Sequence, residues 1–205
     1  MIEPAKFALF VGVSWILILA PGPDMLYVIT RGMAHGRRAG IVSALGVVCG
    51  ILVHTTAAAF GLTLLLKAST PAFLTVKYLG AAYLIHLGFK AWQAKNSFHL
   101  QTSSVNSRSL FWQGTLSNVL NPKIAIFFLA FLPQFVDQGG GRVALQMVIL
   151  GLTFALFGLC FLVVVGYFAG SVGAWLTNQP RCTNLLRWLT GGVLVGLGTR
   201  LALSE

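Results

Sequence analysis

Two short motifs combine proline with a charged residue, and each lies inside an apolar stretch long enough to form a helix. They are Pro21-Gly22-Pro23-Asp24 and Asn121-Pro122-Lys123. Because proline has no backbone N–H and clashes with the preceding turn, each motif is expected to break its helix. A break frees carbonyls that can bind a cation, and the helix that restarts after it offers amides to an anion. A zwitterion suits such a site, as does a cation with its counter-ion; a proline kink used only for packing is the simpler alternative.

The charges in these motifs are a second indication of function. Asp24 is the one acidic residue deep inside an apolar segment, and Lys123 lies far from either end of its own segment. A charge near the centre of a bilayer costs about 2.5–3.5 kcal/mol on insertion scales, and such residues usually mark a pathway. If the two motifs meet, we expect Asp24 and Lys123 to pair. A substrate that displaces this partner would then make Asp24 a proton-coupling group.

Composition indicates that the segments around these motifs lie in a membrane. Hydrophobic residues make up 57% of the 205-residue chain and charged residues only 9%, with a mean hydropathy of +0.83. Soluble domains carry about a quarter charged residues, so the surface of this chain is expected to face the lipid bilayer. The formal net charge is +10, but the basic residues fall mostly between the apolar segments, as membrane anchoring requires. No basic cluster alternates with aromatic residues, so we predict no nucleic-acid partner.

The sequence lacks the patterns typical of metal sites, cofactor sites and enzymes. Cys49, Cys160 and Cys182 have no metal-ligand spacing, and the four histidines form no HxxxH pair. His54 and His86 lie within apolar stretches, where a helix-packing role is favoured over proton relay. The chain has four acidic residues and no hydrolase or nucleotide motif. We therefore predict that it is no enzyme, binds no metal or cofactor, and draws its energy from an ion gradient.

Apolar stretches of about 20 residues, the length needed to cross a bilayer, predict six transmembrane helices. They cover residues 7–30, 40–66, 72–92, 111–134, 143–170 and 185–203. The first is interpreted as a retained span and not as a signal peptide, because Glu3 accompanies Lys6 and apolar residues resume after Pro23. The predicted fold is one all-α integral membrane domain over residues 1–205.

The two halves of the chain resemble each other. We divide it into a first three-helix repeat at 1–92, a polar linker at 93–110 and a second three-helix repeat at 111–205. Lys77–Lys90 aligns without gaps on Arg187–Arg200, with matching basic ends, an aromatic residue, three leucines and a late glycine. A chance match between two leucine- and glycine-rich helices is the alternative. Three spans per half would make the repeats inverted, and broken helices at corresponding positions of inverted repeats point to a midplane binding site.

Two weaker patterns concern orientation and assembly. Basic residues are more frequent in the first, third and fifth connections than on the opposite side, which favours both termini outside. Glycines recur at four-residue spacing, as in Gly32, Gly36 and Gly40 or in Gly192 and Gly196. Such spacing lets helices approach closely in a membrane. It favours tight internal packing or a homodimer without choosing between them.

In combination, the motifs and the repeat resemble the LysE/RhtB family of bacterial amino-acid exporters. Leu19–Asp24 and Leu116–Lys123 are similar to the two signatures of that family, and Tyr78–Gly88 is similar to its third span. The resemblance implies export of amino acids from the bacterial cytoplasm through the inner membrane, driven by the proton-motive force. It assigns the motif positions to Pro21, Gly22, Pro23, Asn121, Pro122 and Lys123. Related proteins often carry Asn at the position of Asp24, so the resemblance implies a substrate contact there more than an obligatory proton carrier.

The leading hypothesis is therefore a secondary exporter of neutral amino acids or analogues, of the homoserine, threonine or leucine type. Because few acids lie inside the membrane, a cationic substrate is less suitable. An inorganic-ion exporter would need several midplane carboxylates or thiols, where this chain offers only Asp24. A membrane enzyme would need a dense polar or histidine-rich cluster at one membrane face, and a scaffold would not need two charged, broken helices.

Overall fold

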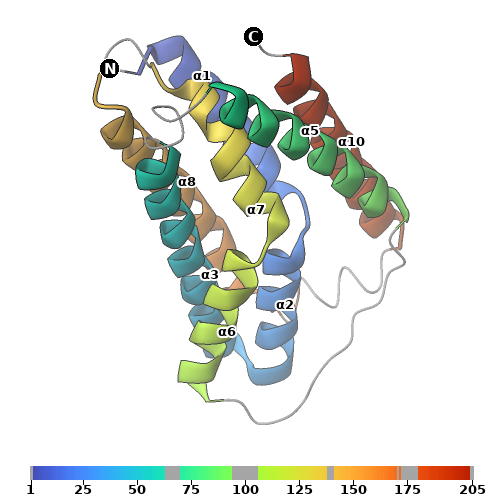
Figure 1. Ribbon diagram of the computed structural model, residues 1–205. Coiled ribbons are helices and arrows are strands. Elements are labelled where there is room, and N and C mark those ends of the chain that lie inside the picture. The colour runs from blue at the N-terminus through green and yellow to red at the C-terminus, as the bar shows by residue number, and fades with distance from the viewer. Residues whose placement is uncertain are drawn as a thin grey trace.

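The computed structural model of the chain describes residues 2–62, 70–93, 106–137, 141–169, 171 and 180–203. All regular elements within these residues are helices (Figure 1), which confirms the predicted helical class. The first half contains α1 (Pro4–Leu19), α2 (Pro23–His35), α3 (Arg37–Ala57), the π-helical turn η1 (Ala58–Leu62) and α5 (Thr70–Gln93). The second half contains α6 (Ser107–Val119), α7 (Pro122–Ile126), the π-helical turn η2 (Phe127–Phe131), the 3-10 turn η3 (Leu132–Phe135), α8 (Val143–Tyr167) and α10 (Pro180–Leu203).

Both proline motifs break a helix, as the sequence predicts. Pro23 is the first residue of α2 and Pro122 is the first residue of α7, where the missing N–H of proline costs no helical hydrogen bond. The backbone is extended at Ala20 and Gly22 before α2 and at Asn121 before α7. The helix axis bends by 48° between α1 and α2, and by 49° between α6 and the segment that begins with α7.

Length and hydropathy identify two unbroken helices in the described residues that can cross a membrane, Arg37–Gly61 and α8. Each bent pair can supply one more span, which gives up to four. α5 and α10 extend over 24 residues each but are not among these candidates, so the count of six spans stays a prediction. The ends of the predicted spans 40–66 and 143–170 and most of the predicted linker 93–110 lie outside the described residues.

α3 is the central helix of the larger of two packed groups. It packs against α2, α6 and α8, while α5 and α10 pack against each other beside this group (Figure 1). Glycines set the closest approaches, because a side chain on Gly40 would overlap the backbone of Gly166, and one on Gly46 would overlap the carbonyl of Phe111. Several glycines of the four-residue pattern therefore serve packing within the chain. The homodimer stays a prediction.

α5 and α10 run antiparallel, and their contacts are reciprocal. A Cβ added to Gly88 would lie 2.7 Å from the carbonyl oxygen of Gly191, and a Cβ added to Gly198 would lie 2.7 Å from the carbonyl oxygen of Ala81. In the gapless alignment of the two halves, Gly88 corresponds to Gly198 and Ala81 corresponds to Gly191. Equivalent residues of the two stretches thus make equivalent contacts.

Phenylalanine side chains form a buried cluster where α1, the segment from α7 to η3, and α8 meet. The ring centroid of Phe10 lies 6.3 Å from that of Phe127 and 5.3 Å from that of Phe135. The ring of Phe127 lies 5.6 Å from Phe131 and 5.0 Å from Phe154. These five residues, called the phenylalanine cluster below, are at most 3% exposed. Large buried aromatic surfaces in stacked and edge contacts stabilise this part of the bundle.

Candidate functional site

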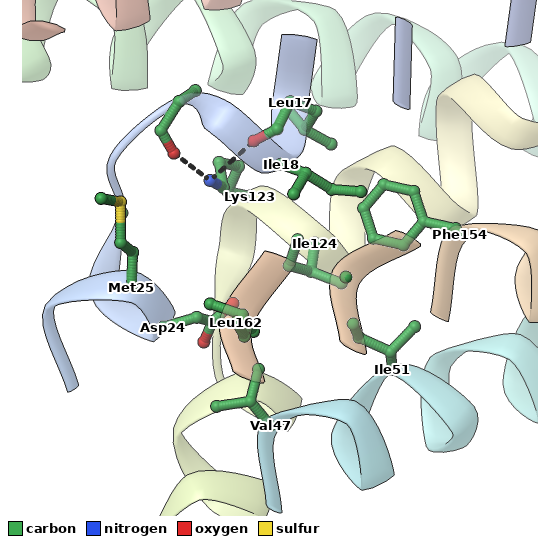
Figure 2. Close-up of a pocket in the computed structure, with 13 residues that line it drawn as sticks. Leu17, Ile18, Asp24, Met25, Val47, Ile51, Lys123, Ile124, Phe154 and Leu162 are labelled. Carbon is green, nitrogen blue, oxygen red and sulfur yellow. Dashed lines mark hydrogen bonds between the residues drawn. The ribbon is translucent and has the colours of Figure 1, made fainter. Parts of the chain in front are cut away.

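The structure brings the two proline motifs together between the α1–α2 bend and the α6–α7 bend (Figure 2). Asn121 Nδ2 donates a hydrogen bond of 2.8 Å to Asp24 Oδ2. Lys123 Nζ donates to the main-chain carbonyls of Leu17, at 3.3 Å, and Ala20, at 3.1 Å. Asp24 and Lys123 are each only 8% exposed. Both motifs therefore contribute side chains to one buried site.

The first break supplies carbonyl oxygens and the space that Lys123 occupies. In an unbroken helix the Leu17 carbonyl would accept from the N–H of residue 21, but Pro21 has no N–H. The ammonium group of Lys123 takes the place of that missing donor and also binds the Ala20 carbonyl. Gly22 permits this approach, because a Cβ there would lie 2.9 Å from Lys123 Nζ.

Asn121 connects the second break to the first. Its Oδ1 accepts a 3.1 Å hydrogen bond from the main-chain N–H of Lys123, which caps the start of α7. Its Nδ2 is then directed at Asp24. An asparagine side chain carries both an acceptor and a donor group, so one residue can cap its own helix and bind a carboxylate on another.

Asn118 is a site residue that the sequence analysis did not single out. Its Nδ2 donates to the same carboxylate oxygen, Asp24 Oδ2, at 2.9 Å. It lies in the last turn of α6, three residues before Asn121 and within the stretch Leu116–Lys123, and this place in the signature was the available signal. His54 of α3 lies close as well, with Nε2 3.1 Å from the Asn118 carbonyl oxygen. His54 therefore makes a packing contact that helps to hold the second break.

The hydrogen bonds of Asp24 and Lys123 are made with uncharged groups and not with each other, although a direct pair was expected. The Asp24 carboxylate accepts from two amides, and the Lys123 ammonium donates to two carbonyls. Asp24 also lies in the first turn of α2, where the positive end of the helix dipole stabilises a carboxylate. Its Oδ1 is buried and accepts no hydrogen bond from the described residues. The ammonium group of Lys123 has a third N–H beyond the two already used.

A cavity of about 30 Å³ lies against both charged residues (Figure 2). Apart from Asp24 and Lys123, its wall is built from small and apolar residues. The larger ones are Leu17, Ile18, Met25, Val47, Ile51, Ile124, Phe154 and Leu162. This volume holds about one water molecule. An organic solute can enter only if the surrounding helices move.

Different kinds of contact lie between the site and the two ends of the bundle. On one side, Tyr27 Oη donates to the Leu110 carbonyl at 2.7 Å, and Arg31 Nη2 donates to Gln113 Oε1 at 3.1 Å. This side leads to the turn between α2 and α3 and to the start of α6, which we call the basic end after its arginines, Arg31, Arg37, Arg38 and Arg108. On the other side lies the phenylalanine cluster, whose member Phe154 lines the cavity.

Comparison with known proteins places the chain among membrane translocators. The family model described as LysE type translocator matches residues 15–205. A leucine efflux protein of Enterobacter sp. (strain 638) is 30% identical over 96% of this chain and 95% of its own length. A homoserine/homoserine lactone efflux protein of Salmonella typhimurium is 31% identical over 92% of each chain. An uncharacterized membrane protein of Bacillus subtilis, YrhP, is 30% identical over 95% of this chain and 97% of its own.

No solved protein structure matches this chain. The family match includes both proline motifs and the whole of the second half, and the relatives extend over almost the full length of the chain. The broken helices that meet at a buried, charged site are thus features of a member of a transport family. The chain belongs to the LysE family of membrane translocators, whose members are transporters and not enzymes.

Proposed function

We propose that this multi-pass protein of the bacterial inner membrane exports neutral amino acids, and that Asp24 binds the ammonium group and Lys123 the carboxylate of the substrate. The observation that carries the proposal is that both groups lie on the wall of one cavity. Asp24 Oδ1 accepts no hydrogen bond from the described residues, and Lys123 has an N–H still to donate. A zwitterionic amino acid carries the complementary charges at its α-carbon. Hydrogen bonds between charged groups are about twice as strong as those between neutral ones.

The rest of the cavity wall favours a neutral side chain on the substrate. Val47, Ile51, Phe154 and Leu162 present no polar side-chain atoms to the cavity. A cationic side chain would bring a further charge into this apolar space, and a buried charge without a partner is costly. One relative is named for efflux of leucine and another for efflux of homoserine and homoserine lactone, and leucine and homoserine are neutral amino acids.

Transport requires the site to open to one side at a time. Because basic residues gather on the cytoplasmic side of membrane proteins, we assign the basic end to the cytoplasm and both termini to the outside. Separation of Tyr27 from Leu110 and of Arg31 from Gln113 would admit a substrate from the cytoplasm. Separation of the phenylalanine side chains from one another would release the substrate on the other side.

We infer that two inverted three-span repeats move against each other in this cycle. The order of elements is the same in both halves: a bent pair, a long apolar helix and a 24-residue helix. The long helices α3 and α8 pack antiparallel, with Gly40 beside Gly166 and Thr55 beside Gly151. α5 and α10 are antiparallel as well. Antiparallel packing of equivalent helices is expected when the repeat axis lies in the membrane plane.

Proton coupling follows from competition at Asp24. A proton that arrives from outside neutralises the carboxylate and thereby releases the ammonium group of the substrate. When the site reopens to the cytoplasm, a new substrate replaces the proton. The inward movement of protons down their gradient would then drive the outward movement of the amino acid.

Efflux from cells loaded with single amino acids, supplied as dipeptides, tests the proposed function. Cells that produce the chain should release leucine and threonine faster than cells that lack it, and should release lysine and arginine at the same rate. Equal release of every amino acid by the two cell populations would refute the proposal. Faster release of an inorganic ion alone would favour the alternative ion exporter.

The variant Asp24→Asn tests the coupling step. It keeps the shape of the side chain but removes the charge and the group that takes up the proton, so the leucine efflux rate should fall about 10- to 100-fold, the loss expected for one hydrogen bond to a charged group. The remaining efflux should no longer depend on external pH. An unchanged rate with an unchanged pH dependence would exclude Asp24 as the coupling residue.

A further inference from the structure

Gly158 differs from the other buried glycines of the described helices. A Cβ added to any of the others would come within 3.0 Å of a neighbouring atom. On α8 itself, Gly151 faces the side chain of Thr55 and Gly166 faces the backbone of Gly40. A Cβ added to Gly158 would meet only the Cδ1 atom of Ile51, at 3.3 Å. Packing therefore requires glycine at positions 151 and 166, but not at position 158.

Helix stability gives no reason for glycine at this position either. Gly158 lies in the interior of α8, a 25-residue α-helix. Glycine is less stable than alanine inside a helix, because it loses more backbone freedom when the helix forms. The end of the Ile51 side chain is flexible, so it can make room for one methyl group. The reason for glycine at position 158 is therefore sought in the space next to this residue.

That space is the wall of the cavity at the candidate site. Phe154, Gly158 and Leu162 follow one another at four-residue intervals, so they lie along one side of α8, and all three line the cavity. Ile51 of α3 lines it as well (Figure 2). Gly158 is thus a gap in an otherwise bulky apolar wall, between Phe154 and Leu162 and next to Ile51.

We propose that Gly158 sets the size of the substrate side chain, and that its gap receives a branched aliphatic side chain such as that of leucine. This inference rests on the proposed function. If Asp24 and Lys123 hold the two charged groups at the α-carbon, the side chain has only the apolar wall to contact. When the helices separate to admit a substrate, the cavity can widen most where no side chain stands. A larger residue at position 158 would take up that space and leave room for a small side chain only.

The variant Gly158→Ala tests the size assignment through a ratio of two substrates. Leucine efflux relative to alanine efflux should fall about tenfold or more, the usual effect of one methyl group in a close-fitting apolar pocket, and Gly158→Val should lower the ratio further. Gly12→Ala is the matched control, because Gly12 is an exposed helical glycine of α1 with no neighbouring atom within 4 Å of an added Cβ. It should leave the ratio unchanged. Membrane levels of each variant are measured alongside.

The opposite change at Ile51 provides an independent measurement. Ile51→Val removes a methyl group beside Gly158, so it should raise the efflux of phenylalanine relative to leucine. Combined with Gly158→Ala, it should restore part of the lost leucine efflux. Because Ile51→Val also removes the atom nearest to the added Cβ, the rescue is measured as the ratio of leucine to alanine efflux at equal membrane levels, a ratio that recovery of the fold alone would not change. If Gly158→Ala fails to accumulate in the membrane, Ile51→Val alone decides the question.

The outcomes separate the size assignment from the proposed function. If the unchanged chain exports leucine while Gly158→Ala and Ile51→Val both leave the substrate ratios unchanged, the role of Gly158 is wrong and the proposed function stands. If the unchanged chain exports no amino acid, the proposed function fails and the size assignment fails with it. Both the size assignment and the proposed function are supported if Gly158→Ala lowers leucine efflux relative to alanine efflux and Ile51→Val raises phenylalanine efflux relative to leucine efflux.

Discussion

The two helix breaks occupy corresponding places in the two halves but bind in opposite ways. In each, a proline begins the new helix and a charged residue follows it, Asp24 after Pro23 and Lys123 after Pro122. The first break offers main-chain carbonyls to Lys123, whereas the second offers side-chain amides to Asp24. Each half therefore holds the charge of the other half. The position of a break in a helix does not determine which charge it binds.

The difference arises from the residue that precedes each proline. Gly22 has no side chain, so the carbonyls of the first break stay open to the Lys123 ammonium. Asn121 fills the corresponding place in the second break, caps its own helix and extends an amide toward Asp24. Gly22 thus lets the first break bind a cation, and Asn121 lets the second break bind an anion.

Removal of the Lys123 charge should disturb this arrangement most. In the variant Lys123→Met, the carbonyls of Leu17 and Ala20 lose their donor, and a substrate carboxylate would lose its cation. Loss of one partner of a buried charged contact typically costs about 2–5 kcal/mol, so we expect leucine efflux to fall at least about 30-fold at equal protein levels in the membrane. Efflux at the original rate would mean that the substrate carboxylate binds elsewhere.

Two asparagine variants separate helix capping from contact with Asp24, and their effect should be intermediate. Asn121→Ala removes both functions, whereas Asn118→Ala removes only a hydrogen bond to Asp24. An asparagine cap contributes about 1 kcal/mol, so Asn121→Ala should lower the free energy of unfolding by about that much more than Asn118→Ala. Thermal unfolding of the detergent-solubilised variants measures the difference. Equal losses would show that the cap adds nothing to the second break.

The smallest effect is expected for Gly22→Ala. The added Cβ would lie 2.9 Å from Lys123 Nζ, the far end of a flexible side chain that can shift to relieve the contact. We expect a loss of about 1 kcal/mol, or roughly fivefold in leucine efflux, the typical value for one hydrogen bond. Gly12→Ala serves again as the control. If Gly22→Ala matched the unchanged chain, the approach of Lys123 would not depend on glycine.

Local chemistry was sufficient to predict the breaks, because proline and glycine act on their own stretch of chain. The meeting of the two motifs could also be expected from the similarity of the halves. The exchange of partners could not, because it depends on how far α1 and α6 extend before they bend. That geometry sets Lys123 against the carbonyls of Leu17 and Ala20. From the charges alone, Lys123 was expected to pair directly with Asp24.

Two other features depend on contacts that are distant in the sequence. Asn118 lies in the same motif as Asn121, yet only the fold shows that both amides reach one carboxylate oxygen. Gly158 is one of 23 glycines in the chain, and nothing in its local sequence separates it from Gly151 or Gly166. The neighbouring helix makes that distinction, because it packs tightly against two of these glycines and places only the end of the Ile51 side chain beside the third.

The reciprocal contact between α5 and α10 bears on the ancestry of the chain. Two copies of a shorter chain, each with one such helix, would make this contact in a symmetric dimer, in which the same patch serves on both partners. In that dimer any substitution would appear on both copies at once, so equivalent positions could never carry opposite charges. Duplication of the gene would lift this restriction, and fusion of the two copies would keep the contact between Gly88 and Gly191 and its counterpart in one chain. Asp24 and Lys123, opposite charges after the two helix breaks, are an arrangement that a symmetric dimer of identical copies cannot reach.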